Sequence, residues 1–272
     1  MTPPEPVRVT PGDGPLVLGV PHAGTYVPPD LLDGLNEHGR ALADTDWHVP
    51  RLYADLLPDV TVVEAVAHRY VIDCNRPPDG ESLYPGQNTT GLCPTTDFEG
   101  RPIHRDGAAP DGAEQARRLE AWHRPYHEAL ADALARARAR HGVAVLYDAH
   151  SIRCRLPFLF AGLLPDFNIG TNGGTSCARR VAEAVETAVR AAIPDGFTMV
   201  RDGRFKGGWT TRHYGRPDEG VHAVQMELAQ AAYMDEAPPW TYRPERADRL
   251  RRHLRRVLLA ARDTARVLAR GT

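Results

Sequence analysis

The segment VAVLYDAHS, residues 143–151, constrains the fold more than any other part of the chain. Its first half is a continuous apolar run, which is typical of a parallel strand buried on both faces of a sheet. Its second half carries Asp148, His150 and Ser151, polar side chains that burial alone does not explain. Ligands of open α/β sheets bind beyond the carboxyl ends of such strands. The segment therefore indicates a central strand whose end is a candidate site.

Strand-like and helix-like segments alternate along the rest of the chain. Short apolar runs predict further strands over 15–20, 59–64, 68–73, 197–200 and 221–228. Helical periodicity predicts helices over 40–56, 112–140, 175–191 and 243–269, the second of them broken or kinked at Pro125. No repeat, linker or composition break interrupts this order. We therefore expect one α/β domain over residues 1–272, with a mixed, mostly parallel sheet.

Composition and charge exclude several classes of protein. The chain has 33 basic and 35 acidic residues and a net charge of -2, so no strong field favours nucleic acid or an anionic membrane. No apolar stretch approaches the roughly 18 to 20 residues of a membrane helix. The basic helix over 243–269 has an apolar stripe, which favours packing on the domain. With no CxxC pair and no signal-like N-terminus, a cytoplasmic protein is expected.

Residues able to bind a metal or a proton follow three of the expected strands. His22, His150 and Glu227 stand at these strand ends, and Asp44 and Asp46 lie in the segment after the first. Hydrolytic zinc sites use three His or carboxylate ligands, and a further carboxylate transfers the proton. Each residue also has an ordinary interpretation, because lone histidines often serve loops and DTDW is an adequate helix cap. Spacing alone leaves the metal site undecided.

A second cluster suits an acidic ligand. HRYVIDCNRPPDG places Arg69, Asn75 and Arg76 around one expected strand and its turn, where they could bind a carboxylate. An arginine that closes a loop by bonding backbone carbonyls is an equal alternative. The following segment, residues 80–108, is expected to be a long loop, and long loops in compact domains are often functional.

Six ordered blocks between about residues 15 and 235 resemble the N-formylglutamate amidohydrolase family. They are VPHAGTYVP, DTDWHVPRLY, RYVIDCNRPPDG, LYDAHSI, FKGGWTTRHYGRP and VQMELAQAAYMDE. The resemblance implies the three-layer α/β/α fold of the zinc carboxypeptidase-like superfamily. It also implies metal-dependent hydrolysis of N-formyl-L-glutamate to L-glutamate and formate, a step of histidine degradation.

The resemblance also implies roles for single residues. His22 and His150 become metal ligands, and Asp46, in preference to Asp44, becomes the carboxylate ligand of one divalent ion, expected to be zinc. Glu227 becomes the base that deprotonates the metal-activated water and passes the proton to the amine. The substrate-binding candidates are Arg69, Asn75, Arg76, Arg153, Lys206 and Arg212.

Two other functions remain open at this point. One is a related amidase for another N-acyl or N-carbamoyl amino acid, and the other is a non-catalytic protein that binds acidic ligands. Both histidines and Glu227 speak against the second, because binding a dicarboxylate needs no proton-transfer base. A serine nucleophile at Ser151 is disfavoured, since neighbouring strand residues point to opposite faces and no GxSxG motif is present. The expected partner is a small acidic substrate, without nucleic acid or membrane, and the oligomeric state stays open.

Overall fold

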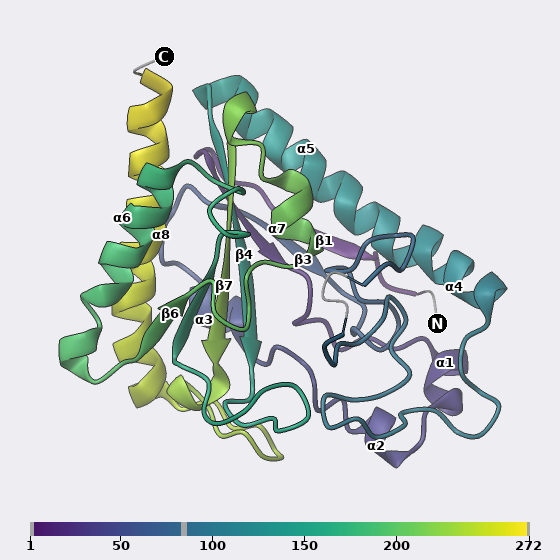
Figure 1. Ribbon diagram of the computed structural model, residues 1–272. Coiled ribbons are helices and arrows are strands. Elements are labelled where there is room, and N and C mark those ends of the chain that lie inside the picture. The colour runs from purple at the N-terminus through teal and green to yellow at the C-terminus, as the bar shows by residue number, and fades with distance from the viewer. Residues whose placement is uncertain (1–2, 83–85, 271–272) are drawn as a thin grey trace.

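A mixed sheet forms the centre of the protein. The computed structural model describes residues 3–82 and 86–270, and within them seven strands pair in the order β1-β3-β2-β4-β7-β5-β6 (Figure 1). Strands β3, β2, β4 and β7 are parallel neighbours, whereas β1 and β5 pair antiparallel with β3 and β7. The predicted mixed, mostly parallel sheet is confirmed. The strands are β1 (Val7–Thr10), β2 (Leu16–Val20), β3 (Thr61–Ala65), β4 (Ala144–Ile152), β5 (Phe167–Gly170), β6 (Met199–Arg201) and β7 (Val221–Ala229).

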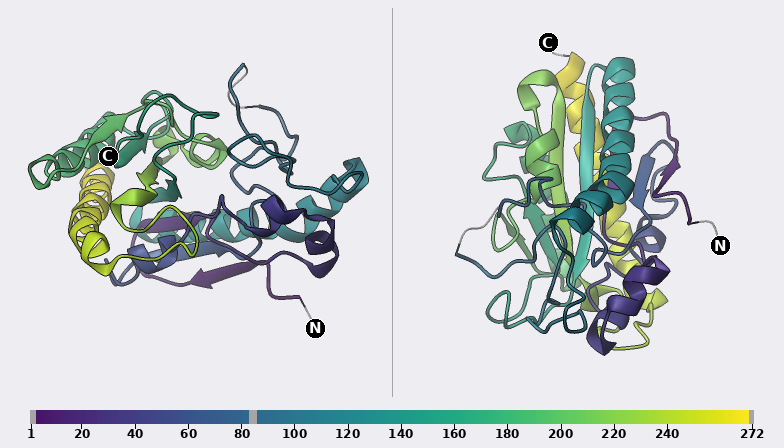
Figure 2. Two further views of the ribbon diagram at one scale, coloured as in Figure 1. Left: turned by 90° about the horizontal axis from the view of Figure 1, so that it is seen from below. Right: turned by 90° about the vertical axis from the view of Figure 1, so that its right-hand side faces the viewer.

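Helices cover both faces of this sheet, which gives the expected three layers (Figures 1 and 2). On one face α5 (Arg124–His141) packs over β1–β4, and on the other α8 (Pro244–Arg270) packs on β4 and on α6 (Arg179–Arg190). The apolar stripe of α8 is buried in the larger core cluster, which confirms its prediction as a packed helix. None of the described helices is long and apolar enough to cross a lipid bilayer.

Shorter helices occupy the connections. They are α1 (Pro29–Gly34), α2 (Glu37–Arg40), α3 (Val49–Tyr53), α4 (Gly112–Arg118) and α7 (Trp209–Tyr214), with 3₁₀ turns at Ile193–Asp195, Pro217–Glu219 and Gln230–Ala232. A π-helical turn, Leu119–His123, joins α4 to α5. Pro125 lies in the first turn of α5, directly after this π-helical turn, so the α-helical pattern is interrupted where a break or kink was predicted, although the backbone stays helical.

Strand β4 continues through the polar residues of its second half. It pairs with β7 without interruption from Ala144 opposite Val221 to Ile152 opposite Ala229, and every β4 residue is buried. Alternation sends Tyr147 into the core beneath α8 and turns His150 to the opposite face. On that face α5 covers the first half of the strand, and the carboxyl half forms the floor of a cleft.

Two predicted elements are wrong. The helix expected over 40–56 is reduced to α3. His48, which precedes α3, has a left-handed backbone conformation, and Pro50 in the first turn has no N–H to donate. The strand expected over 68–73 is a series of turns, in which the Val71 N–H bonds the His68 carbonyl at 2.9 Å. Its apolar side chains are buried, and those of Val71 and Ile72 belong to the core cluster that includes side chains of α5. The four-residue strands β1 and β5 and the helices α1, α2 and α7 were not predicted.

Candidate metal centre and cleft

The sheet brings the predicted ligands to one place. Strand β2 lies beside β4 and β4 beside β7, so His22 after β2, His150 on β4 and Glu227 on β7 share one edge. The turn before α3 joins them, because the Asp46 N–H bonds the His22 carbonyl at 3.1 Å. The residues of four chain segments therefore form one buried cluster.

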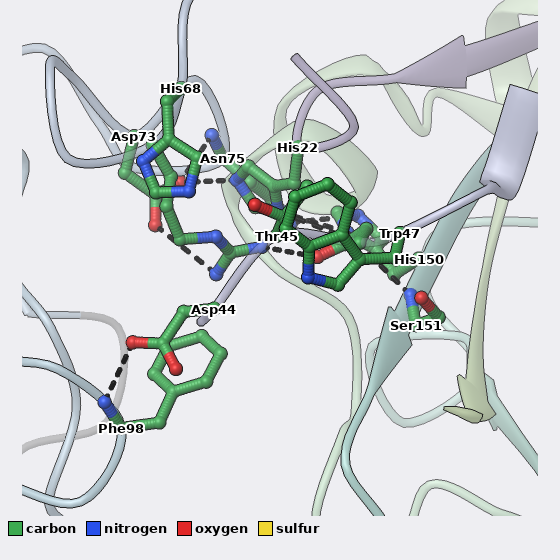
Figure 3. Close-up of polar contacts among 12 residues, drawn as sticks. His22, Asp44, Thr45, Trp47, His68, Asp73, Asn75, Phe98, His150 and Ser151 are labelled. Carbon is green, nitrogen blue, oxygen red and sulfur yellow. Dashed lines mark hydrogen bonds and ion pairs between the residues drawn. The ribbon is translucent and has the colours of Figure 1, made fainter. Parts of the chain in front are cut away.

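Three electron-rich atoms converge in this cluster, as Figure 3 shows for the two histidines. His22 Nδ1 lies 3.2 Å from His150 Nδ1, and Asp46 Oδ2 lies 3.3 Å from His150 Nδ1 and 3.9 Å from His22 Nδ1. Tetrahedral zinc with bonds of ~2.0–2.1 Å separates its ligand atoms by about 3.4 Å. The three atoms therefore fit the donor set and the spacing of a divalent metal.

Carboxylates hold the other nitrogen of each histidine. His22 Nε2 lies 2.7 Å from Asp73 Oδ1, and His150 Nε2 lies 3.1 Å from Asp148 Oδ2. In the neutral rings these nitrogens donate to the carboxylates, which leaves both Nδ1 lone pairs directed at each other and at Asp46. Carboxylate partners of this kind orient histidine ligands in metal sites.

Arg69 places a positive charge beside Asp46 and Asp73. Its Nη2 donates to Asp46 Oδ1 at 2.7 Å, and its Nη1 lies 4.0 Å from Asp73 Oδ2. Burial and the Arg69 charge lower the pKa of His22 to about 4, so this ring is neutral, as a ligand must be. Burial raises the pKa of Asp46, but Arg69 and the histidines outweigh it and keep the carboxylate ionised.

The pKa of His150 is shifted in the opposite direction to that of His22. Burial alone would lower its pKa, yet the carboxylates of Asp148 and Asp46 hold it well above the ordinary value. The second proton of the His150 ring then lies on its Nδ1, between His22 Nδ1 and Asp46 Oδ2. Metal binding releases such protons, so a divalent ion would take the place of this one.

Glu227 lies beside the cluster on the floor of the cleft. It stands opposite His150 in the β4–β7 register, and both side chains therefore point to the same face. Burial raises the pKa of Glu227 to about 8; the His150 charge opposes this shift and the Asp46 charge adds to it. A carboxyl that titrates near neutral pH is suited to proton transfer.

The cleft above the cluster has about 620 Å³ of empty space, which includes its solvent-open mouth. Its walls carry cationic and amide groups from the β3–α4 and β6–α7 connections and from β7, together with apolar side chains. The lining residues include Arg69, Asn75, Arg76, Asn88, Thr90, Phe98, Ile152, Leu159, Arg204, Phe205, Gly208 and Gln225. The arrangement suits a small ligand with negative charges and one reacting group close to His22, His150 and Glu227.

The predicted substrate-binding residues divide into two groups. Arg69, Asn75 and Arg76 line the cleft. Among the described residues that line it, Arg153, Lys206 and Arg212 are not found. Arg153 instead pairs with Asp44 and Glu99 at 2.9 and 2.6 Å. Arg212 Nε donates to the Gly207 carbonyl.

Arg204 lines the cleft and was not predicted. Its Nε donates to the Leu159 carbonyl at 3.0 Å, and its Nη2 donates to the Asn88 carbonyl at 3.1 Å. It directly precedes the FKGGWTTRHYGRP block, so its position in the sequence was the one available signal.

Asp44 and Asp46 have separate surroundings. Asp44 accepts hydrogen bonds from the Tyr70 hydroxyl at 2.7 Å and from the Phe98 N–H at 2.8 Å, and Figure 3 shows it turned toward Phe98. It therefore fixes the loop that places Phe98 over Arg69. Of the two aspartates, only Asp46 belongs to the described His–Asp–His cluster.

Ser151 is engaged away from His150. Its Oγ lies 2.7 Å from the Tyr233 hydroxyl oxygen, and its backbone N–H donates to Asp46 Oδ2 at 3.0 Å. This geometry offers no histidine base to the hydroxyl, in agreement with the expectation from strand alternation.

Comparisons with known proteins agree on one family. The model of the family described as N-formylglutamate amidohydrolase matches residues 14–234. An N-formylglutamate deformylase of Pseudomonas aeruginosa is 50% identical over 250 residues, which cover 91% of this chain and 92% of that protein. One of Pseudomonas putida is 49% identical over 248 residues, 90% and 91% of the two chains. The crystal structure of an N-formylglutamate amidohydrolase from Ralstonia eutropha JMP134 has a TM-score of 0.79 at 28% identity and covers 98% of this chain and 100% of that one.

Proposed function

The chain belongs to the N-formylglutamate amidohydrolase family, and from that premise we propose that it hydrolyses N-formyl-L-glutamate to L-glutamate and formate with one zinc ion. The convergence of His22, Asp46 and His150 beside the buried Glu227 is the observation that carries this proposal. The cationic wall of the cleft supports an acidic substrate.

His22 Nδ1, His150 Nδ1 and Asp46 Oδ2 would hold the proposed ion. Bound there, it would supply a Lewis acid that activates water and polarises the formyl carbonyl. Two imidazoles and one carboxylate are a donor set that hydrolytic zinc uses. Zinc is proposed on this donor set, and other divalent metals are alternatives that a metal analysis distinguishes.

Glu227 is the proposed proton carrier. Its carboxylate takes a proton from the attacking water and delivers it to the amine as the C–N bond breaks, so no covalent intermediate is needed. A nearby cation would lower the pKa of Glu227 from about 8, which would leave the carboxylate ionised at neutral pH. Arg69 serves this centre by holding Asp46 in place, since its Nη2 is already bonded to Asp46 Oδ1.

Asn75, Arg76 and Arg204 are the proposed binding groups for the two carboxylates of the substrate. All three line the cleft. Arg76 is fixed by bonds from Nε to the Thr90 carbonyl at 2.8 Å and from Nη2 to Thr90 Oγ1 at 3.1 Å. An arginine fixed in this way loses little side-chain entropy when it binds a carboxylate.

The proposal is tested by formate release from N-formyl-L-glutamate before chelation, after chelation and after zinc is added back. We expect release that chelation abolishes and zinc restores. N-formyl-L-leucine, which lacks the second carboxylate, is the matched control and should react slowly. No release from folded, zinc-loaded protein would contradict the proposed substrate, and release that resists complete metal removal would contradict the metal mechanism.

Replacing Arg76 with Ala should raise the KM for N-formyl-L-glutamate by about 10- to 100-fold, because a charge-assisted hydrogen bond to a carboxylate is lost. The metal content should not change, since Arg76 is outside the three-ligand cluster. The control is Arg180→Ala on the exposed face of α6. A KM equal to that of the native enzyme would exclude Arg76 from substrate binding.

A further inference from the structure

Two buried histidines beside the cleft have no part in the chemistry above. His123 is the last residue of the π-helical turn, and His127 lies one helical turn later in α5. Spacing of four residues places both side chains on the same face of the helix. This face is turned toward the Cys74–Arg76 turn, which carries two of the proposed substrate-binding groups.

Each histidine binds one backbone carbonyl of that turn. His123 Nε2 lies 3.0 Å from the Arg76 carbonyl oxygen, and His127 Nε2 lies 2.8 Å from the Cys74 carbonyl oxygen. A carbonyl oxygen only accepts hydrogen bonds, so both Nε2 atoms carry protons and donate. The two donors hold the residues on either side of Asn75.

The surroundings keep both rings in place. Trp209, at the start of α7, packs with its ring 5.5 Å from His123 and 4.6 Å from His127. The Tyr214 hydroxyl lies 3.0 Å from His127 Nδ1. Burial lowers the pKa of His123 and, with the His123 charge, lowers that of His127 to about 3, so neutral rings with one N–H each are retained.

The turn between the two carbonyls reaches the reactive centre. Asn75 Oδ1 accepts from the Thr210 N–H at 2.9 Å, and Asn75 Nδ2 lies 3.1 Å from His150 Nε2. The Asn75 N–H donates to Asp73 Oδ1, the atom that also binds His22. The approach is close, because a Cβ on Gly208 would lie 2.3 Å from Asn75 Nδ2. Small displacements of the turn would therefore move a substrate-binding amide.

We propose that His123 and His127 are positioning residues, which hold Asn75 and Arg76 in the geometry that binds the substrate carboxylate. This inference rests on the proposed function. The π-helical turn contributes to this positioning. Pro125 cannot donate within the helix, and the wider turn before Pro125 ends at His123, which faces the Arg76 carbonyl.

The test compares two substitutions at each histidine. His123→Phe and His127→Phe keep a planar ring but remove the donor, whereas His123→Gln and His127→Gln keep an N–H donor at similar reach. His213→Phe is the matched control. The exposed His213 ring stacks on the same Trp209, with 4.4 Å between the two ring centroids. For each zinc-loaded variant we would measure KM, kcat, metal content, Tm and the Kd of L-glutamate by calorimetry.

The Phe variants should raise KM and the Kd of L-glutamate by about 10-fold each, with metal content unchanged, because misplaced binding groups cost affinity. The Gln variants should recover most of this loss, and His213→Phe should stay within about twofold of the native enzyme.

Different outcomes overturn different statements. If both Phe variants lower the Tm but leave KM and the Kd of L-glutamate unchanged, the histidines only pack the helix against the loop. Loss of metal in the Phe variants would place their effect at the metal centre and would also contradict the proposal. If the native protein binds L-glutamate but releases no formate, the proposed activity fails, and the Kd values alone still decide the positioning role.

Discussion

Replacing Glu227 with Gln should lower kcat for N-formyl-L-glutamate by about 10²- to 10⁴-fold, the range that general acid–base catalysis contributes. The amide has nearly the shape of the carboxyl group but can neither take nor deliver the proton. Glu227 is outside the three-ligand cluster, so the variant should still bind about one metal ion per chain. The measurement is steady-state kcat together with the metal content of the same sample.

Stability and a matched control separate this effect from misfolding. Glu227 is buried, and burial raises its pKa, so an uncharged amide should not lower the Tm. Glu64→Gln is the control, because Glu64 lies on β3 and burial also raises its pKa, but it does not line the cleft. A Glu227→Gln enzyme with near-native kcat would remove Glu227 as the proton carrier, whatever the metal content.

The strands that carry the site could be predicted from local sequence. The runs 143–151 and 221–228 became β4 and β7, and their parallel register places His150 opposite Glu227. Buried parallel strands leave a continuous apolar signal, and the sheet then brings their polar ends together. The π-helical turn and α5 were predictable as a broken helix because Pro125 interrupts a clear helical pattern.

Residues whose partners are distant in the sequence could not be assigned in this way. Arg153 follows His150 closely and was a reasonable substrate-binding candidate, but its partner Asp44 is 109 residues away. Arg204 enters the cleft because of the loop path after β6, which no periodic pattern describes. The segment 68–73 contains a short apolar run like that of a strand, yet turn hydrogen bonds replace the sheet pairing. Local patterns report burial, but they do not report the partner against which a residue is buried.

Asp44 and Asp46 illustrate the same limit at the metal centre. They are two residues apart and both buried, and each binds an arginine, Arg153 for Asp44 and Arg69 for Asp46. Sequence position alone does not distinguish them. In the structure Asp46 Oδ2 points at the two Nδ1 atoms, whereas Asp44 fixes Tyr70 and the Phe98 backbone.

Replacing Asp46 with Asn should therefore weaken metal binding by more than about 100-fold, because losing a group that merely orients a ligand already costs about 10- to 100-fold. Formate release at limiting zinc should fall with it. The measurement is zinc content after dialysis against a weak chelator, together with a competition titration that gives the zinc Kd.

Asp44→Asn is a closely matched control for this variant. Both substitutions exchange a buried, arginine-paired carboxylate for an amide, so both should lower the Tm through the broken ion pair. Only Asp46→Asn should lose the metal, and Asp44→Asn should retain about one ion per chain. Loss of zinc from Asp44→Asn with retention in Asp46→Asn would reverse the assignment. Equal loss from both folded variants would show that buried charge, and not ligation by Asp46, sustains metal binding.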